Sequence, residues 1–285
     1  MNQVDLHLHT TFSDGTLTPT EIIEISANRG LKYISITDHD STEGIDEGFK
    51  AARQYSDLEL IPGVELSTDV PGTEIHLLGY FVDQNDSEFQ NTLSVFRDSR
   101  KERAKRMVKK LSELNVKISW ERVQEISNGA SIGRPHIAQA MVELGYVNYP
   151  KDAFDKFLGR NAPAYVERIR LTPSDAIELL VKNGAVPIMA HPTFAIPNMN
   201  KDGLSKLTEM LVEMKEAGLA GLEVYYGLYS TEETNKLRTI AEDLELICTG
   251  GSDYHGSGNP EEAKIGTVGP PVTTMDLLKN SRKMT

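Results

Sequence analysis

The first residues of the chain alternate between apolar and polar side chains. Along residues 4–9 the apolar residues occupy every second position, and Asp5, His7 and His9 occupy the positions between them. A period of two is typical of a β-strand, whose successive side chains point to opposite faces. The pattern therefore predicts a strand that places one carboxylate and two imidazoles on a common face.

Helix boundaries are marked by capping residues. Thr18 has the side chain of an N-cap, a proline follows at the first helical position, and Glu21 completes a capping box. The apolar pattern that follows ends near Gly30, a residue that often terminates helices. The segment 172–175 repeats this start with Thr-Pro-Ser-Asp, and Gly184 ends that helix. We therefore expect helices over residues 19–28 and 173–183.

Strand and helix patterns alternate over most of the chain. Parallel strands joined by crossover helices favour an α/β fold with right-handed closure into a barrel. The expected strands are 4–9, 33–37, 58–66, 75–82, 186–190, 222–226 and 246–250, and the other helices between them are 43–55, 202–217 and 230–243. The sequence thus predicts an α/β barrel of seven mostly parallel strands.

One long segment lacks strand patterns. Between residues 86 and 166 we find only helical patterns, over 87–114, 121–126, 135–144 and 151–158. The alternation resumes after this segment. We therefore predict a catalytic barrel formed by residues 1–85 and 167–285, and a helical insertion domain formed by residues 86–166.

Composition excludes several function classes. The 285 residues include 42 acidic and 30 basic side chains, a formal charge of −12, which argues against non-specific binding to duplex DNA or to a membrane surface. The single cysteine, Cys248, allows no internal disulfide and lies in an expected buried strand. No signal-peptide core and no run of about 20 apolar residues is present. We expect a cytoplasmic protein, and no obligate protein partner is evident.

A basic segment stands out against this acidic background. Residues 97–110 contain eight basic and two acidic side chains. Such a segment is usually a solvated helix face. The alternative is that it attracts an anionic substrate towards the site.

All the histidines lie in short polar motifs, and most of these motifs also contain an acidic residue. Neutral imidazole is the commonest metal ligand, and neighbouring carboxylates favour divalent cations. The seven are His7, His9, His39, His76, His136, His191 and His255.

The position of these motifs strengthens the interpretation. The histidine and carboxylate motifs fall at or just after the carboxyl ends of predicted strands, the rim on which barrel enzymes build their active sites. Glu65 ends an apolar strand, and a bound cation explains a buried glutamate better than a surface ion pair does. The motifs at this rim are His7 with His9, Asp38 with His39, Glu65, His191, and Asp253 with His255.

Each motif taken alone also has a structural explanation. His7 and His9 could be polar positions of an edge strand, and His39 could lie in a solvated loop. His191 could make a simple hydrogen bond at a strand end. The motif 253–255 could be a glycine-rich turn with incidental polar residues. The order of all the motifs along the chain is what favours a metal centre.

That order resembles the PHP (polymerase and histidinol phosphatase) family. The motifs extend from residue 5 to residue 255: His-x-His at 7–9, Ser-Asp-Gly at 13–15, Thr-Asp-His at 37–39, Glu65, His76, His-Pro at 191–192 and Asp-x-His at 253–255. The resemblance implies a distorted seven-stranded β/α barrel that holds up to three divalent metal ions and hydrolyses phosphate esters.

The resemblance also implies the ligands of each metal. The first site would use His7, His9, Glu65 and Asp253; Glu65 would bridge to a second site with His76 and His191; the third would use Asp14, His39 and His255. Some relatives have histidine at the position of Asp14, so the preference here shifts towards Mn²⁺ or Mg²⁺, with Zn²⁺ or Fe²⁺ as alternatives.

Two of these assignments have specific alternatives. Asp14 could simply be a turn residue before Gly15. His76 is the least strand-terminal of the candidates, and it could be an inward barrel residue with only a structural hydrogen bond.

Two metal ions sharing a water molecule would activate it for attack on phosphorus, and a third would offset charge on the phosphate oxygens. Among the remaining candidate catalytic residues, Asp38 is expected to orient a histidine N–H group, as is Asp40.

The motif Gly133-Arg-Pro-His136 opens a predicted helix. It would place the Arg134 guanidinium near free backbone N–H groups, an arrangement suited to phosphate. The motif resembles one in a PHP subgroup that acts on nucleoside 3′,5′-bisphosphates and short 5′-phosphorylated RNA. Arg134 could instead pair with a surface carboxylate, and His136 could either contact the same phosphate or cap the helix.

We therefore predict a metal-dependent phosphoesterase that acts on small nucleotides or short RNA. The alternatives are a phosphatase for a non-nucleotide monoester such as histidinol phosphate, and a non-catalytic metal-binding PHP module.

Overall fold

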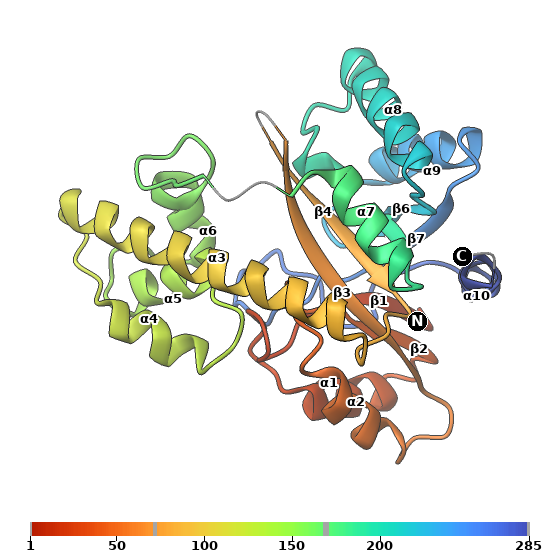
Figure 1. The fold of residues 1–285 in the computed structure, drawn as a ribbon, viewed down its shortest axis with the longest axis horizontal. Coiled ribbons are helices and arrows are strands. Elements are labelled where there is room, and N and C mark those ends of the chain that lie inside the picture. The colour runs from red at the N-terminus through yellow and green to blue at the C-terminus, as the bar shows by residue number, and fades with distance from the viewer. Residues whose placement is uncertain (1, 71–72, 168–170, 284–285) are drawn as a thin grey trace.

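A computed structural model describes residues 2–70, 73–167 and 171–283. Its strands form a single sheet in the order of the sequence. The His9 N–H donates to Tyr254 O at 3.0 Å, and the Asp253 N–H donates to His7 O at 2.9 Å, so the two edges of the sheet nearly meet. The predicted seven-stranded α/β barrel is confirmed (Figure 1), with strands β1 (Val4–Leu8), β2 (Tyr33–Ile36), β3 (Glu59–Val70), β4 (Thr73–Tyr80), β5 (Val186–Met189), β6 (Gly221–Tyr226) and β7 (Ile247–Gly251).

The direction of one strand differs from the prediction. β4 is antiparallel to both of its neighbours, β3 and β5, whereas the other neighbouring pairs are parallel. β3 continues to Val70, so there is no room for a crossover helix before β4, and a parallel connection needs a dozen or more residues. Because β4 runs backwards, its beginning lies at the rim where the parallel strands end. This brings His76, early in β4, to that rim.

Helices cover the outside of the barrel. The Thr18 hydroxyl accepts from the Glu21 N–H, and Glu21 accepts from the Thr18 N–H, as the capping box predicts. The final helix, α10, was not predicted, because no side chain caps its start. These elements are α1 (Pro19–Asn28), α2 (Ile45–Ala52), α7 (Pro173–Lys182), the short 3₁₀ helix η2 (Pro192–Phe194), α8 (Lys201–Glu216), α9 (Thr231–Asp243) and α10 (Thr274–Arg282).

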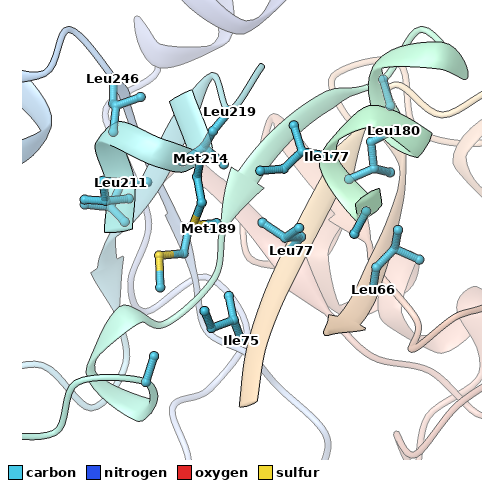
Figure 2. Packing of buried hydrophobic residues seen from close by; sticks show 14 of the residues in the cluster. Leu66, Ile75, Leu77, Ile177, Leu180, Met189, Leu211, Met214, Leu219 and Leu246 are labelled. Carbon is cyan, nitrogen blue, oxygen red and sulfur yellow. The ribbon is translucent and has the colours of Figure 1, made fainter. Parts of the chain in front are cut away.

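The main apolar core lies between the sheet and helices α7, α8 and α9 (Figure 2). Leu77 of β4, Leu180 of α7 and Leu211 of α8 are fully buried there. α7 packs closely on β4 because Gly79 has no side chain: a Cβ atom at this position would lie 2.4 Å from Leu180 Cδ2. Burial of each such leucine stabilises the fold by about 1.5–3 kcal/mol.

Residues 86–166 contain no strand in the described structure. They form a helical body beside the barrel, with its own apolar cluster around Met107, Leu111, Ile137 and Met141. The first half of its long helix instead contributes Phe89 and Leu93 to the barrel core. One helix thus belongs to both cores. The elements are α3 (Ser87–Glu113), α4 (Trp120–Ser127), α5 (Arg134–Glu143), α6 (Pro150–Ala153) and the π-helical turn η1 (Phe154–Leu158).

Within the described residues, no helix has the length and apolar character required to cross a membrane.

Candidate metal centre

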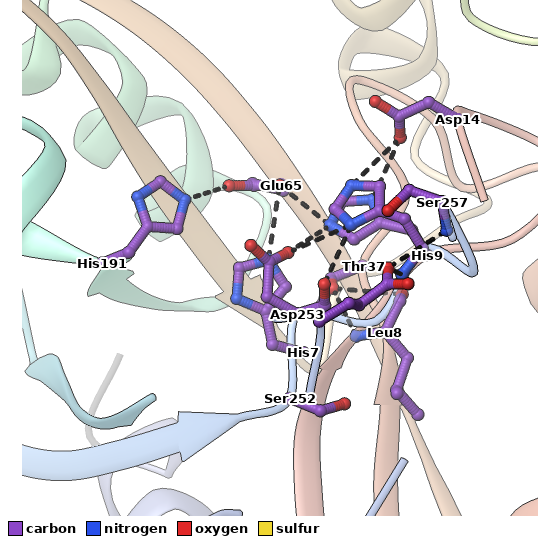
Figure 3. Close-up of polar contacts among 12 residues, drawn as sticks. His7, Leu8, His9, Asp14, Thr37, Glu65, His191, Ser252, Asp253 and Ser257 are labelled. Carbon is purple, nitrogen blue, oxygen red and sulfur yellow. Dashed lines mark hydrogen bonds and ion pairs between the residues drawn. The ribbon is translucent and has the colours of Figure 1, made fainter. Parts of the chain in front are cut away.

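The nine candidate metal ligands meet at the rim of the barrel. All except the fully buried His7 and His9 line a cavity of about 1440 Å³. Figure 3 shows the central side chains pointing towards one another from different strands. They are His7, His9, Asp14, His39, Glu65, His76, His191, Asp253 and His255, and below we call them the rim cluster.

Glu65 lies at the centre of the rim cluster and is 1% exposed. Its Oε1 lies 2.8 Å from His76 Nδ1 and 3.0 Å from His191 Nε2. Its Oε2 lies 3.1 Å from His39 Nδ1, 3.2 Å from His9 Nε2 and 3.4 Å from His7 Nε2. One carboxylate therefore has an oxygen near each of two groups of imidazoles, which is the geometry expected of a bridging ligand.

The potential ligand atoms gather into three overlapping groups, each with its atoms within 4.8 Å of one another. One group coincides with the first predicted site, and another contains the third predicted site with His9 in addition. The middle group joins Glu65 and His76 with His39, while His191, expected in this site, contacts the same Glu65 oxygen as His76. The groups are His7, His9, Glu65 and Asp253; His9, Asp14, His39 and His255; and His39, Glu65 and His76.

Several buried atoms of the rim cluster have no hydrogen-bond partner among the described residues. A buried polar group without a partner costs free energy, so such atoms are rare in folded proteins. Mixed imidazole and carboxylate donors at this spacing suit divalent cations, which would supply the missing partner. The atoms are His7 Nε2, His9 Nε2, His39 Nδ1, Glu65 Oε2 and both carboxylate oxygens of Asp14.

The charges of the rim cluster perturb its own titration. Burial alone would lower the pKa of His9, but the nearby carboxylates of Asp253 and Glu65 outweigh it and raise this pKa to about 10. Burial would raise the pKa of Asp14, but the nearby His39 and His255 imidazoles hold it well below its usual range. The carboxylates of Asp253 and Glu65 therefore favour a protonated His9 when no cation is bound, and a cation that binds His9 displaces this proton.

Asp38 has different partners from those expected. Its carboxylate accepts from the Thr10 N–H at 2.7 Å, from the Thr10 hydroxyl at 2.6 Å and from the Ser13 hydroxyl at 2.5 Å. It is 1% exposed. Asp38 thus fixes the loop that carries Asp14. We expected its carboxylate to accept from a histidine N–H, and it accepts from Thr10 and Ser13 instead. Asp40, the other expected orienting carboxylate, accepts from Arg100 Nε at 2.5 Å.

Glu223, on β6, is a buried residue that sequence reasoning missed. Its Oε1 accepts from His7 Nδ1 at 3.1 Å, and its Oε2 accepts from the His191 N–H at 2.7 Å. The sequence did contain a signal for Glu223: it is a lone glutamate within an apolar strand, the feature that identified Glu65.

Arg134 lies in the wall of the cavity, with its side chain 17% exposed. Its Nη2 donates to Glu74 Oε2 at 2.5 Å, and Arg103 Nη2 donates to the other oxygen of Glu74 at 3.0 Å. Arg134 therefore pairs with a carboxylate, as one of the two interpretations expected. The partner, Glu74, lines the cavity and is not a surface residue. Arg134 thus lines the same cavity as most of the rim cluster.

Of the two roles considered for His136, contact with phosphate and capping of the helix, the structure shows the capping role. Its Nδ1 accepts from the Gly133 N–H at 3.0 Å, and its Nε2 donates to Ser13 O at 2.9 Å. Both ring nitrogens are thus occupied by backbone groups, so the expected contact with substrate phosphate is not available in this conformation. His136 joins the insertion to the loop before Asp14.

Comparisons with known proteins agree with this geometry. The family described as "PHP domain" matches residues 5–168. The chain is 30% identical to a 3′,5′-nucleoside bisphosphate phosphatase of Chromobacterium violaceum, over 90% of this chain and 89% of that protein. It is 31% identical to a 5′-3′ exoribonuclease of Haemophilus influenzae, over 88% of this chain and 89% of the relative.

A solved structure from Bifidobacterium adolescentis, described as that of a metal-dependent phosphoesterase, superposes with a TM-score of 0.87. It is 31% identical and covers 98% of this chain and 96% of its own. Barrel, rim cluster and relatives together define a metal-dependent phosphoesterase. The chain belongs to the PHP family, as the order of its motifs predicted.

Proposed function

We propose that this protein hydrolyses phosphate esters of small nucleotides: it releases phosphate from nucleoside 3′,5′-bisphosphates, and nucleotides from the 5′ end of short 5′-phosphorylated RNA. The observation that carries the proposal is that one cavity is lined both by members of the rim cluster and by Arg103 and Arg134, the two arginines that Glu74 holds. The relatives named as a bisphosphate phosphatase and an exoribonuclease support this substrate class.

In this proposal the rim cluster holds three divalent ions, with Mn²⁺ the first candidate because imidazole and carboxylate donors are mixed. When bound, such ions activate water and polarise the phosphate ester. Zn²⁺, Fe²⁺ and Mg²⁺ are the alternatives. The protein's own contribution is to hold its ligands at fixed positions, with Glu65 shared between the groups.

Arg134 would bind the phosphate that is cleaved. A guanidinium offers a fork of N–H donors that matches phosphate oxygens. Glu74 and the Phe154 ring, whose centre lies 5.4 Å from Arg134 Cζ, restrict the orientation of this fork. A charged group oriented before substrate binds stabilises the transition state without reorganisation.

The mouth of the cavity has the apolar surface that a nucleobase needs. Phe194 is 54% exposed and Leu228 is 52% exposed, and both line the cavity. The Phe194 ring lies 4.5 Å from the His191 ring, centre to centre, so it adjoins the rim cluster. Aromatic side chains bind bases of any sequence by stacking. The cavity of about 1440 Å³ also exceeds the common range of about 300–1,000 Å³ for small-molecule sites, which leaves room for a short oligonucleotide.

A substrate panel tests the proposal. Purified protein with Mn²⁺ would be given a nucleoside 3′,5′-bisphosphate, a 5′-phosphorylated trinucleotide, histidinol phosphate and p-nitrophenyl phosphate. We expect the highest kcat/KM for the two nucleotides, and an Asp253→Asn variant serves as the inactive control. If the bisphosphate releases no phosphate and the trinucleotide releases no mononucleotide, the substrate assignment is overturned. A preference for histidinol phosphate would favour the monoesterase alternative.

A further inference from the structure

Strand β6 contributes no member of the rim cluster, yet two of its side chains contact members of that cluster. Glu223 accepts from His7 Nδ1 at 3.1 Å and from the His191 N–H at 2.7 Å. The Tyr226 hydroxyl donates to Asp253 Oδ2 at 2.9 Å. Glu223 is fully buried and Tyr226 is 6% exposed, so water competes little for these bonds.

A regular strand could not place both side chains on this face. Residues three positions apart point to opposite sides of a strand. In the pairing of β6 with β7, Glu223 lies opposite Thr249 and Tyr225 lies opposite Gly250, so β6 contains one extra residue. Such β-bulges often redirect side chains next to active sites. Here Val224 and Tyr225 both pack against the core on the helix side, and Tyr226 returns to the cavity.

The partner strand is adapted to this bulge. A Cβ atom at Gly250 would lie 2.0 Å from Tyr225 O, far inside the normal contact distance. Only a residue without a side chain therefore fits opposite the bulge. The glycine of β7 and the bulge of β6 form one local arrangement.

The chemistry at position 223 requires a carboxylate. Its two oxygens face two donors, His7 Nδ1–H and the His191 N–H, and a carboxylate only accepts. Accepting from Nδ1–H leaves His7 Nε2 directed at Glu65 and Asp253, 3.4 Å and 3.2 Å away. The bond to the His191 N–H also holds that residue at φ 24°, a conformation that residues other than glycine rarely adopt.

A glutamine at 223 has one acceptor and one donor. With its oxygen on the His191 N–H, its NH₂ group would face His7 Nδ1, which would then have to accept. The proton of a neutral His7 would move to Nε2, the nitrogen that faces the other ligands.

We propose that Glu223 and Tyr226 are positioning residues: Glu223 sets the tautomer of His7 and the backbone of His191, and Tyr226 orients Asp253 for cation binding. The inference rests on the proposed metal centre. It adds to that centre the strand that orients its ligands, through groups that touch the ligands and not the substrate.

The test compares Glu223→Gln and Tyr226→Phe with Tyr225→Phe, which removes a hydroxyl from the same strand on its helix side. Mn²⁺ affinity would be measured by titration, with thermal melting as the check of folding. Loss of a residue that orients metal ligands typically weakens metal binding by about 10–100-fold. We expect this loss for Glu223→Gln, a loss near its lower end for Tyr226→Phe, and wild-type affinity for Tyr225→Phe.

A second readout needs no metal. In the metal-free wild type, the His7 Nδ1–H proton should give a downfield, slowly exchanging NMR signal because it donates to a buried carboxylate. In Glu223→Gln this signal should disappear or move upfield, because the carboxylate acceptor is gone. Unchanged Mn²⁺ affinity together with an unchanged His7 signal would overturn the inference. If Glu223→Gln fails to fold, equal affinities of Tyr226→Phe and Tyr225→Phe would overturn the assignment of Tyr226, and a difference between them would support it.

These results can be separated from a failure of the proposed function. A wild-type protein that binds no Mn²⁺ would contradict the metal centre itself, whereas the His7 signal would still test the contact with Glu223.

Discussion

Two groups of charged side chains at the cavity differ in how their polar atoms are satisfied. In the rim cluster, atoms such as His7 Nε2, His39 Nδ1 and Glu65 Oε2 have no hydrogen-bond partner among the described residues. Among the arginines that line the cavity, Arg100 donates to Asp40 at 2.5 Å, and Arg134 donates to Glu74 at 2.5 Å. The rim cluster therefore needs cations to satisfy its ligand atoms, whereas these arginines already have carboxylate partners in the protein.

Substitutions in these two groups should therefore reduce activity to different extents. A buried carboxylate surrounded by imidazoles is useful only if cations bind, so altering it should abolish function. A paired arginine is held in place by its carboxylate, so altering either partner should weaken substrate binding in a graded way. The predictions below follow this order.

The largest effect is expected from Glu65→Gln. An amide cannot serve both groups of imidazoles as a bridging anion, so cation binding and transition-state stabilisation should both fail. We expect kcat/KM to drop by several kcal/mol, on the order of 10³-fold or more. Steady-state kinetics with Mn²⁺ measures this.

Glu59→Gln is the matched control, because Glu59 begins the same strand but forms an exposed ion pair with Lys279. It should retain wild-type kinetics. A Glu65→Gln enzyme within tenfold of wild type would mean that the rim cluster is not the reaction centre.

Arg134→Ala should have the next largest effect. Removing a charged group that pairs with a desolvated phosphate costs about 2–5 kcal/mol in kcat/KM. Arg134→Lys should recover only part of this, because an ammonium cannot form the same fork of bonds. Mn²⁺ affinity should stay at the wild-type value in both variants.

Arg238→Ala provides the comparison for Arg134→Ala, since Arg238 pairs with Glu242 on α9 outside the lining of the cavity. If Arg134→Ala and Arg238→Ala have equal kcat/KM, Arg134 does not bind the substrate.

Glu74→Gln should give a smaller, pH-dependent loss of stability. Burial would raise the pKa of Glu74, but the charges of Arg134 and Arg103 outweigh it and hold this pKa well below its usual value. A depressed folded-state pKa stabilises the fold above the unfolded pKa of about 4.5, and this contribution is lost as pH falls through the folded value. The variant should therefore be less stable at pH 7 by about 1–3 kcal/mol, with the difference shrinking in acid.

Thermal melting of the wild type and of Glu74→Gln, from pH 7 into acid, measures this difference in stability. Glu88→Gln, which breaks only an exposed pair with Lys182, should change stability by less than about 1 kcal/mol. A Glu74→Gln penalty that stays constant from pH 7 into acid would show that the ion pairs are not its cause.

The smallest effect concerns the basic helix face of α3. Arg106 and Lys109 are exposed there, whereas Arg103 is buried in the cavity wall. Replacing both exposed residues with glutamate should lower kcat/KM only about two- to threefold at low salt, and the loss should vanish as salt screens the field. An effect that is independent of salt would argue against attraction of the substrate over distance.

Much of the fold could be predicted because its determinants are local. The alternation in β1 and the capping boxes at Thr18 and Thr172 depend on residues within a few positions of one another. The direction of β4 could not be predicted this way, because hydrophobic alternation does not distinguish a hairpin from a crossover. Helix α10 lacks a capping side-chain bond, and its apolar pattern, with Met275 and Leu278 buried, is too short to predict a helix by itself.

The candidate site likewise contains residues that could be predicted from the sequence and residues that could not. Its histidines lie in recognisable motifs, so the rim cluster could be assembled from the sequence. Glu223 and Tyr226 lie in no histidine motif, and Glu74 was noticed only as a neighbour of His76. Each acts through one side chain whose partners lie far away in the chain, so no local pattern reveals them. Asp38 was noticed for its neighbour His39, yet its bonds go to Thr10 and Ser13, which no pattern near residue 38 could reveal.

The central claim is that the unsatisfied atoms of the rim cluster bind divalent cations. Crystals soaked in Mn²⁺ and measured at an energy where manganese scatters anomalously test it directly. The account predicts anomalous peaks within bonding distance of His7, His9, Glu65 and Asp253, with further peaks beside Asp14 and His76. Crystals that show no peak at this rim, with the same side chains hydrogen-bonded only to water and to one another, would contradict it.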